Sequence, residues 1–392
     1  MPNKTITPKA PDLDWLRGYV TPSILDAAPY KIETPPATLK LDQNESPWDL
    51  PSALKRKVLD KLLARPWNRY PSAFADDIAA KLAASIGVEP SAILLGPGSN
   101  YLIGLALEVF GKGFVGQGGQ ATGGQGRLVV ARPSFPLYES HSRYEGLPYE
   151  TWSLNADLEY DVELLPALPR GSLVMFASPN NPVGNVLPRQ TLEDLLKRHP
   201  DTLWIADEAY YEYASEPYTE LVGQYPNLIL LRTFSKTMGA AGVRIGYFVA
   251  HERYLDPLRK VRVPYLLNHF AIAAADVLVS DPEVQEHLAS IKRNAIEQRS
   301  RVHAELTQIG RQAGFSVKPS EANFLLLRWP SNAAATEVYR SLIEVGVLVR
   351  NFCGALGLTG CLRVTLGDEQ ENMALVEAFR RVVAKGSQNS KI

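Results

Sequence analysis

The chain of 392 residues is long enough to bury a large core and to fold as more than one domain. Its apolar and charged fractions, 45% and 21%, are those of an ordinary globular protein. The formal net charge of -1 argues against a basic surface for nucleic acid or anionic membranes. No apolar run reaches membrane-spanning length, and the first residues lack the apolar core of a signal peptide.

Cysteine and histidine usage narrows the class of protein further. The two cysteines, Cys353 and Cys361, lack CxxC spacing, so we expect reduced thiols. The six histidines show no paired spacing typical of metal ligands. We therefore predict a cytoplasmic protein with no bound metal and no nucleic-acid or membrane partner.

The N-terminal 50 residues are rich in proline and poorly periodic, which is typical of an arm that lies against another part of the protein. A helix is expected over 51–63, and another from near Ser72 to Gly87. We place an N-terminal arm at 1–50, a large domain at 51–285 and a smaller C-terminal domain at 286–392.

The large domain shows short apolar stretches that alternate with helical patterns. Such alternation predicts an α/β fold with a mostly parallel sheet covered by helices on both faces. The expected strands are 92–95, 128–131, 173–177, 203–206, 228–231 and 246–250. The expected helices are 101–110, 135–145, 190–199 and 261–280.

A long helical segment over about 281–314 leads to a second α/β pattern. It predicts the smaller C-terminal domain. The expected strands there are 315–318, 324–328, 347–349 and 361–365, with helices near 333–344 and 369–383.

The segment from Gly111 to Gly126 contains eight glycines in sixteen residues. Residues 116–121 match the sequence of the G-x-G-x-x-[GA] dinucleotide-binding fingerprint but not its structural context. That fingerprint must follow a strand and open a helix, whereas this segment follows a helix and precedes a strand. We therefore interpret it as a loop without a phosphate-binding role.

Lys236 lies in the glycine-rich segment Arg232–Tyr247, beside Ser235 and eight residues before Arg244. A lysine in a tight, partly desolvated turn can lose its proton near neutral pH and form a Schiff base. Serine and arginine side chains suit a phosphate group. For a single lysine, a solvated surface position is the commoner explanation, so the decision depends on the rest of the chain.

Polar clusters follow several of the expected strands, where active sites of open α/β sheets lie. Gly96-Pro-Gly-Ser-Asn100 opens a helix whose free N–H groups suit a phosphate, although such turns are common. Asn181 lies in a turn stiffened by two prolines. Asp207 ends a buried strand, where it needs a cationic partner or serves as a helix cap, and Tyr210 follows.

Aromatic and arginine side chains complete the set. Phe135 or Tyr138, after another strand, can stack on a flat ring, although core packing is the default for either. Arg350 and Arg363 lie near strand ends of the small domain, where they suit carboxylate or phosphate groups or surface ion pairs.

Taken together, these motifs resemble the class I/II aminotransferases of the fold-type I pyridoxal phosphate (PLP) enzymes, and among them most closely the histidinol-phosphate aminotransferases. The order and spacing of the motifs are more specific than any one of them, and the resemblance runs from about residue 25 to residue 383. It implies a seven-stranded, mostly parallel sheet, a small domain, an N-terminal arm and a homodimer with shared active sites. The motifs are Leu41–Pro47, Arg69–Pro71, Gly96–Asn100, Ser178–Gly184, Asp207–Tyr210, Ser235-Lys236, Arg244 and Leu362–Thr365.

The resemblance also implies a role for each cofactor residue. Lys236 is the Schiff-base lysine and the general base, and Asp207 pairs with the ring nitrogen. Asn181 and Tyr210 bind the ring 3-oxygen, and Phe135 stacks on the ring. The cofactor phosphate is bound by Ser235, Arg244, the backbone at Ser99 and Asn100, and Tyr70 of the neighbouring subunit.

The implied substrates are a small-molecule amino donor and a 2-oxo acid. Arg363 would bind the α-carboxylate and Arg350 the substrate phosphate, while Tyr30 and Asn44 of the arm would help to close the pocket. The expected reaction converts histidinol phosphate and 2-oxoglutarate into imidazole-acetol phosphate and glutamate by a ping-pong scheme. Tyr101 and Thr237 depart from the family pattern.

Three alternative functions stay open. An aromatic amino acid aminotransferase differs by few pocket residues, and a threonine-phosphate decarboxylase also binds a phosphorylated substrate. A PLP-sensing transcriptional regulator is disfavoured, because the proline-rich N-terminal segment leaves little room for a helix-turn-helix domain.

Overall fold

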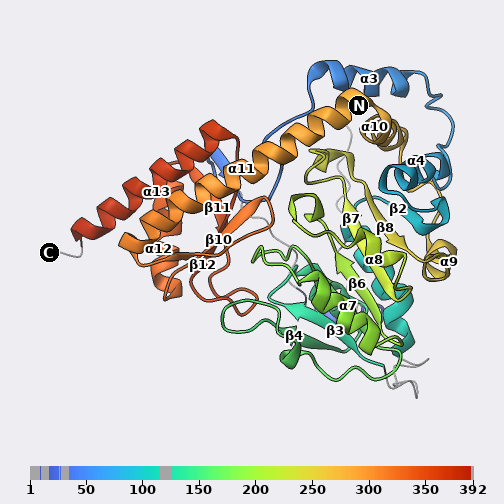
Figure 1. The fold of residues 1–392 in the computed structure, drawn as a ribbon, viewed down its shortest axis with the longest axis horizontal. Helices are drawn as coiled ribbons and strands as arrows, with labels where there is room; N and C mark the ends of the chain where they lie inside the picture. Colours follow the sequence, from blue (N-terminus) through green and yellow to red (C-terminus); the bar gives the residue numbers. More distant parts are fainter. Residues whose placement is uncertain (1–8, 10–16, 26, 28–34, 115–125, 390–392) are drawn as a thin grey trace.

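The computed structural model describes residues 9, 17–25, 27, 35–114 and 126–389, and it contains two β-sheets (Figure 1). The strands of the larger sheet are β2 (Ile93–Gly96), β3 (Leu128–Arg132), β4 (Tyr149–Ser153), β5 (Leu173–Ala177), β6 (Leu203–Asp207), β7 (Leu228–Thr233) and β8 (Gly246–Ala250). Their order is β2-β8-β7-β6-β5-β3-β4, and only the pairings of β8 are antiparallel. The predicted seven-stranded, mostly parallel sheet is confirmed.

Helices cover both faces of this sheet, because its central strands are apolar on both sides. Val174 and Phe176 of β5 join one hydrophobic cluster, whereas Leu173 and Met175 join the opposite one. The first cluster includes α3 (Ser52–Leu63), α4 (Asp76–Ile86), α7 (Arg189–Arg198), α8 (Thr219–Val222) and α10 (His269–Ser280). The second includes α5 (Ser99–Ala106), α6 (Leu137–Tyr144) and α9 (Glu252–Val261).

The smaller sheet has five strands, and the first comes from the segment predicted as an arm. The strands in spatial order are β1 (Leu39–Leu41), β11 (Val347–Asn351), β12 (Cys361–Thr365), β10 (Phe324–Arg328) and β9 (Ser316–Val317). Only β1 and β11 pair in parallel. One face packs on α12 (Asn332–Glu344) and α13 (Glu369–Asn389). The arm is therefore anchored in the small sheet at Leu41, where the motif Leu41–Pro47 starts.

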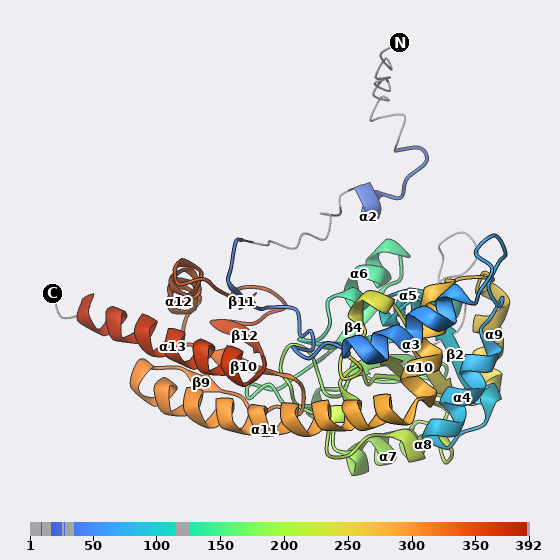
Figure 2. The ribbon, with the colours of Figure 1, turned by 90° about the horizontal axis from the view of Figure 1, so that it is seen from above.

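Helix α11 (Pro282–Ala313) joins the two parts and runs along both of them (Figure 2). Leu288 and Ile291 in its first half belong to the core of the large sheet, whereas Leu306 and Ile309 in its second half belong to the core of the small sheet. The predicted domain boundary at 285/286 falls in the first turns of this helix, and it stays a prediction.

Some local predictions were wrong. The helix expected over 261–280 is interrupted, because α9 ends at Val261 and α10 begins only after Asn268, whose side chain accepts the Ala271 N–H. The edge strand β4 and the helix α9 were not predicted. A short helix, α2 (Pro22–Leu25), lies in the arm. Within the glycine-rich segment, residues 115–125 lie outside the described residues.

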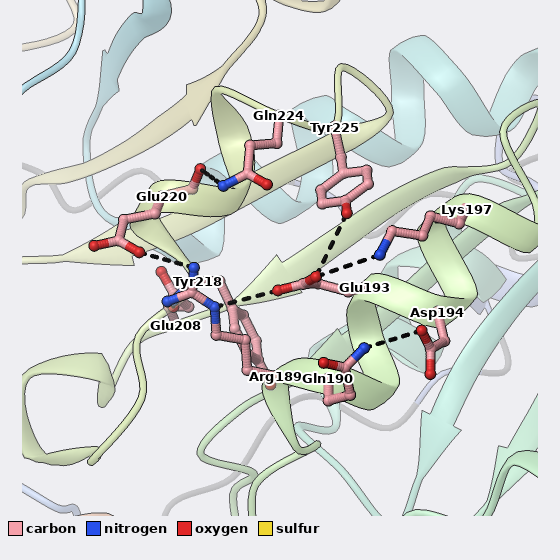
Figure 3. Close-up of polar contacts among 10 residues, drawn as sticks. All are labelled: Arg189, Gln190, Glu193, Asp194, Lys197, Glu208, Tyr218, Glu220, Gln224 and Tyr225. Atoms are coloured by element: carbon pink, nitrogen blue, oxygen red, sulfur yellow. Dashed lines mark hydrogen bonds and ion pairs between the residues drawn. The ribbon is translucent and has the colours of Figure 1, made fainter.

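Helices α7 and α8 are linked by a polar cluster that is separate from the functional site described below. Arg189 of α7 contacts Glu193 of the same helix and Glu220 of α8, and Glu193 also contacts Lys197 and Tyr225 (Figure 3). Partly exposed pairs of this kind contribute little stability each. None of these residues lines the main cavity, so we assign the cluster a structural role.

Candidate active site

Polar side chains from five strand ends converge at one edge of the large sheet. Strands β2, β3, β5, β6 and β7 are mutually parallel, so the residues that follow them meet there. A cavity of about 470 Å³ opens at this edge, between the two sheets. The predicted site residues that line it are Asn44, Ser99, Asn100, Phe135, Asn181, Asp207, Tyr210, Ser235, Lys236, Arg244, Arg350 and Arg363.

Lys236 follows β7, and its amine points into the cavity. The Nζ atom donates hydrogen bonds to the carbonyl oxygens of Gln43 (3.1 Å) and Asn44 (3.0 Å). Burial, and next the positive charge of Arg363, lower the pKa of this amine to about 7. A large fraction of the amine is therefore unprotonated at neutral pH, as a nucleophile or general base requires.

Asp207 ends β6 and is buried, with both carboxylate oxygens held. The Tyr138 hydroxyl donates to Oδ2 (2.7 Å), and the Ala209 N–H donates to Oδ1 (3.0 Å). Burial raises the pKa of Asp207 to about 6, although these two hydrogen bonds act in the opposite direction. A cation in the cavity would favour the ionised form, so this carboxylate suits a positively charged ligand group.

The next residue, Glu208, has its own compensating partner. Its carboxylate accepts hydrogen bonds from Nε (2.8 Å) and Nη2 (2.6 Å) of Arg232, and both side chains are almost fully buried. The charge of Glu208 is thereby balanced away from the cavity, which leaves Asp207 as the carboxylate that β6 presents to a ligand.

Asn44 holds Tyr210 in place. Its side-chain amide donates to the Tyr210 hydroxyl (2.9 Å), while its backbone N–H donates to Thr365 Oγ1 (2.9 Å). Asn44 has a φ of 53°, a left-handed conformation that asparagine tolerates better than most residues. Burial raises the pKa of Tyr210 to about 12, so its hydroxyl keeps its proton and serves as a hydrogen-bond donor.

The start of α5 and the end of the Lys236 loop form a cradle for an anion. Gly98 precedes α5 with φ 90°, and a Cβ atom there would lie 2.6 Å from Nη2 of Arg244. Arg244 donates to Ser235 Oγ (3.4 Å), and free N–H groups of a helix N-terminus face the same cavity. The cradle therefore combines a guanidinium, a hydroxyl and backbone donors, which suits a phosphate group.

Two arginines of the small sheet face this cradle across the cavity. Strands β11 and β12 alternate, so that Val349 and Leu362 face the helices while Arg350 and Arg363 face the cavity. The two arginines are direct cross-strand neighbours. Arg363 donates to the Asn181 side-chain oxygen (2.5 Å) and to the Asp42 carbonyl (2.6 Å). This pair makes a second anion site.

One predicted site residue lies elsewhere, and one cannot be placed. Tyr70 is 80% exposed and does not line the cavity of its own chain. Its ring stacks on the ring of Tyr265, with the two ring centroids 4.6 Å apart. Tyr30 lies outside the described residues. Of the two departures from the family pattern, Tyr101 packs near Arg262 and Thr237 is buried beside Lys236, and neither lines the cavity.

The structure adds side chains that sequence reasoning missed. Tyr138 was considered for ring stacking, but its hydroxyl binds Asp207 and Phe135 is the more open of the two rings. Asp42 and Thr233 also line the cavity. Asp42 could have been found from its place inside the motif Leu41–Pro47. The hydrogen bond of Tyr138 could not, because it joins segments that lie far apart in the sequence.

The match to a family model decides the family. Residues 36–379 match the model described as aminotransferase class I and II. The chain belongs to this family. The predictions of an enzyme, of an aminotransferase and of PLP as cofactor are therefore confirmed. Its small-molecule partners are an amino donor and an oxo acid.

Curated relatives match nearly end to end. The chain is 34% identical over 370 residues to a histidinol-phosphate aminotransferase of Chlorobaculum tepidum, covering 93% of this chain and 100% of the relative. It is 33% identical over 358 residues to one of Aquifex aeolicus, covering 90% and 95%.

Solved structures show the same fold. A histidinol-phosphate aminotransferase of Sinorhizobium meliloti in complex with pyridoxal-5'-phosphate matches with a TM-score of 0.78 at 24% identity, covering 94% of this chain and 98% of that one. An L-threonine-O-3-phosphate decarboxylase of Porphyromonas gingivalis matches with a TM-score of 0.71 at 24% identity, covering 88% and 99%. The predicted fold-type I PLP transferase fold is confirmed.

Within the part of the chain that the structure describes, no helix is long and apolar enough to cross a membrane. The same residues include no group of three or more histidine, cysteine, aspartate or glutamate side chains placed to hold a metal ion.

Proposed function

We propose that this aminotransferase acts on histidinol phosphate and 2-oxoglutarate, and that it releases imidazole-acetol phosphate and glutamate in a ping-pong scheme. The curated relatives that match more than 90% of their own length carry that name. The observation that carries the proposal is the pair Arg350 and Arg363 on neighbouring strands, both facing the cavity that holds Lys236.

Two adjacent guanidinium groups suit a dianionic phosphate, and they also suit a carboxylate. The two half-reactions bring these anions in turn, because histidinol phosphate carries a phosphate whereas 2-oxoglutarate and glutamate carry carboxylates. A purely aromatic substrate side chain would leave Arg350 without an anionic partner in the cavity. The arginine pair therefore favours an anionic substrate over an aromatic one.

The cavity also fits the cofactor. Arg244, Ser235 and the backbone at Ser99 and Asn100 would hold its phosphate, because Gly98 leaves the space that a Cβ atom would fill. Asp207 would face the ring nitrogen, Asn181 and Tyr210 the 3-oxygen, and Phe135 one ring face. Bound PLP supplies a reactive carbonyl and a ring that withdraws electrons from the substrate carbon.

The residues of the chain then bind, orient and move protons. Lys236 Nζ would provide the amine that holds the cofactor, and its pKa of about 7 would let the same amine take the substrate α-proton. Asp207, held by Tyr138, would keep a negative charge beside the ring nitrogen of the cofactor. Arg350 and Arg363 fix the substrate anion.

A homodimer with shared sites belongs to the same proposal. Tyr70 is exposed and stacks on Tyr265, and it would reach the phosphate cradle of the neighbouring subunit. The sequence segments that flank this pair also expose Leu63, Trp67, Val263 and Phe270. Exposed apolar surface of this kind often marks an interface between proteins. A cytoplasmic location is also proposed, and the free thiols of Cys353 and Cys361 agree with it.

A substrate panel tests the proposal. Steady-state rates are measured with 2-oxoglutarate and either histidinol phosphate, phenylalanine or tyrosine, while threonine phosphate is tested for release of carbon dioxide. We expect kcat/KM to be highest for histidinol phosphate and to fall about a hundredfold in Arg350→Ala, because a charged hydrogen bond to the substrate phosphate is lost. If Arg350→Ala left histidinol-phosphate turnover unchanged, the aromatic aminotransferase would become the better reading.

A further inference from the structure

Asp42, the residue that follows β1, lines the cavity and carries a buried carboxylate oxygen without a hydrogen-bond partner in the part of the chain that the structure describes. The residue is 2% exposed, and it is one of the residues that line the cavity. Among the described residues, Oδ1 has no hydrogen-bond partner. Burying a polar atom without a partner is costly, so such atoms deserve a functional explanation.

No described side chain satisfies this acceptor. The positive charges of Lys40 and Arg350 favour the ionised form of the Asp42 carboxylate. Within the described part of the chain, however, neither side chain forms an ion pair with it. Burial is the stronger influence, and it raises the pKa of Asp42. The backbone carbonyl of Asp42 accepts a hydrogen bond from Arg363 (2.6 Å), so the residue is fixed next to the substrate-anion site.

We infer that Asp42 is a specificity-determining residue, whose carboxylate accepts a hydrogen bond from the imidazole N–H of the amino donor. The inference rests on the proposed function. In histidinol phosphate, the amine is the reacting group and the phosphate meets the arginine pair. The imidazole N–H is the remaining nitrogen donor. The side chains of glutamate and 2-oxoglutarate offer no such donor.

Two substitutions separate this role from general damage to the site. When the acceptor residue is removed, kcat/KM should fall for a substrate that donates the hydrogen bond and should change little for a substrate without that donor. We expect Asp42→Ala to lower kcat/KM for histidinol phosphate about ten- to one-hundredfold, and Asp42→Asn, which keeps one acceptor oxygen, to lower it less. The half-reaction with glutamate, which uses the same cofactor and arginines, is expected to keep its rate.

Asp49→Asn is the matched control. Asp49 lies on the same segment, its carboxylate is exposed and paired with Lys55, and it does not line the cavity. The same chemical change there is expected to leave both half-reactions unchanged.

Ligands with and without an imidazole ring test the contact from the other side. The wild-type enzyme is expected to prefer histidinol phosphate to phenylalaninol phosphate, and Asp42→Ala is expected to lose most of that preference. Binding without turnover is measured by calorimetry with 3-(imidazolyl)propyl phosphate, which lacks the amine. Its Kd is expected to rise about tenfold or more in Asp42→Ala.

The outcomes distinguish the two proposals. If the wild-type enzyme does not turn over histidinol phosphate, the proposed function fails. If it does, but Asp42→Ala keeps the preference for the imidazole ring and the Kd of the analogue, the inference is overturned. An equal loss in the glutamate half-reaction also overturns it, because the residue would then only maintain the structure of the cavity.

Discussion

At the scale of single residues, the site holds two ionisable groups with pKa values displaced towards neutrality. Burial raises the pKa of Asp207 to about 6 and lowers that of Lys236 to about 7. Both charged forms are therefore costly in the apoenzyme, and a bound ligand that supplies opposite charge relieves the cost. Displaced pKa values of this kind cluster at functional sites.

Asp207→Asn should make the apoenzyme more stable above neutral pH. The folded pKa of Asp207 lies above the unfolded value of 3.8, so ionisation of this group costs stability as pH rises through about 6. Asparagine does not ionise, and the gain at pH 7.5 is expected to reach about 3 kcal/mol, from about two pKa units. Thermal unfolding of the cofactor-free proteins at pH 4 and pH 7.5 measures it.

The gain should shrink to less than about 1 kcal/mol at pH 4, because Asp207 is still protonated in the folded state there and only partly ionised in the unfolded state. An equal gain at both pH values would show that packing, and not ionisation, is responsible. The same substitution should weaken PLP binding, because asparagine offers no negative charge to the ring nitrogen.

At the scale of elements, the start of α5 makes the phosphate cradle depend on one glycine. Gly98→Ala adds a Cβ atom that would lie 2.6 Å from Arg244 Nη2, at a φ of 90° that alanine disfavours. We expect Arg244 to be displaced and the affinity for PLP to fall about tenfold or more, since one charged hydrogen-bond donor is lost. Equilibrium titration of the apoenzyme with PLP measures the affinity.

Gly87→Ala is the control for this change. Gly87 ends α4 with φ 75°, and nothing lies within 4 Å of a Cβ atom there. Both variants carry the strain of alanine at positive φ, but only Gly98→Ala should change the Kd of PLP. Equal effects in the two variants would contradict the cradle.

How far the sequence predicts an element depends on how that element is stabilised. Central strands such as β5 and β7 contain runs of apolar residues, and this local pattern was sufficient to predict them. The edge strand β4, Tyr149–Ser153, has neither an apolar run nor a polar–apolar alternation, and it depends on pairing with β3. Helix α9 contains Pro257, which removes a backbone donor and weakens the helical signal.

At the scale of the whole molecule, the site forms only where distant segments meet. The strand-end residues Asp207 and Lys236 could be predicted from local motifs and strand order. The contacts of Tyr138 with Asp207 and of Asp42 with Arg363 join residues 69 and 321 positions apart. Such pairings depend on the packing of one sheet against another segment, which no local pattern encodes.

The proposed dimer gives a prediction at this scale. Light scattering should give about twice the 43.2 kDa mass of one chain. If Tyr70 serves the neighbouring subunit, co-expression of Lys236→Ala with Tyr70→Ala should restore activity, because one of the two sites in a mixed dimer then carries neither change. A monomer in solution, or mixed dimers as inactive as Lys236→Ala alone, would contradict shared sites.

The most direct test of the central claim is a single-turnover half-reaction. Histidinol phosphate alone is added to the PLP-loaded enzyme, and the cofactor absorbance is followed. We predict conversion to the amine form of the cofactor with one imidazole-acetol phosphate per site, reversal by 2-oxoglutarate, and no conversion in Lys236→Ala. The account is contradicted if histidinol phosphate leaves the spectrum unchanged while phenylalanine or tyrosine converts it.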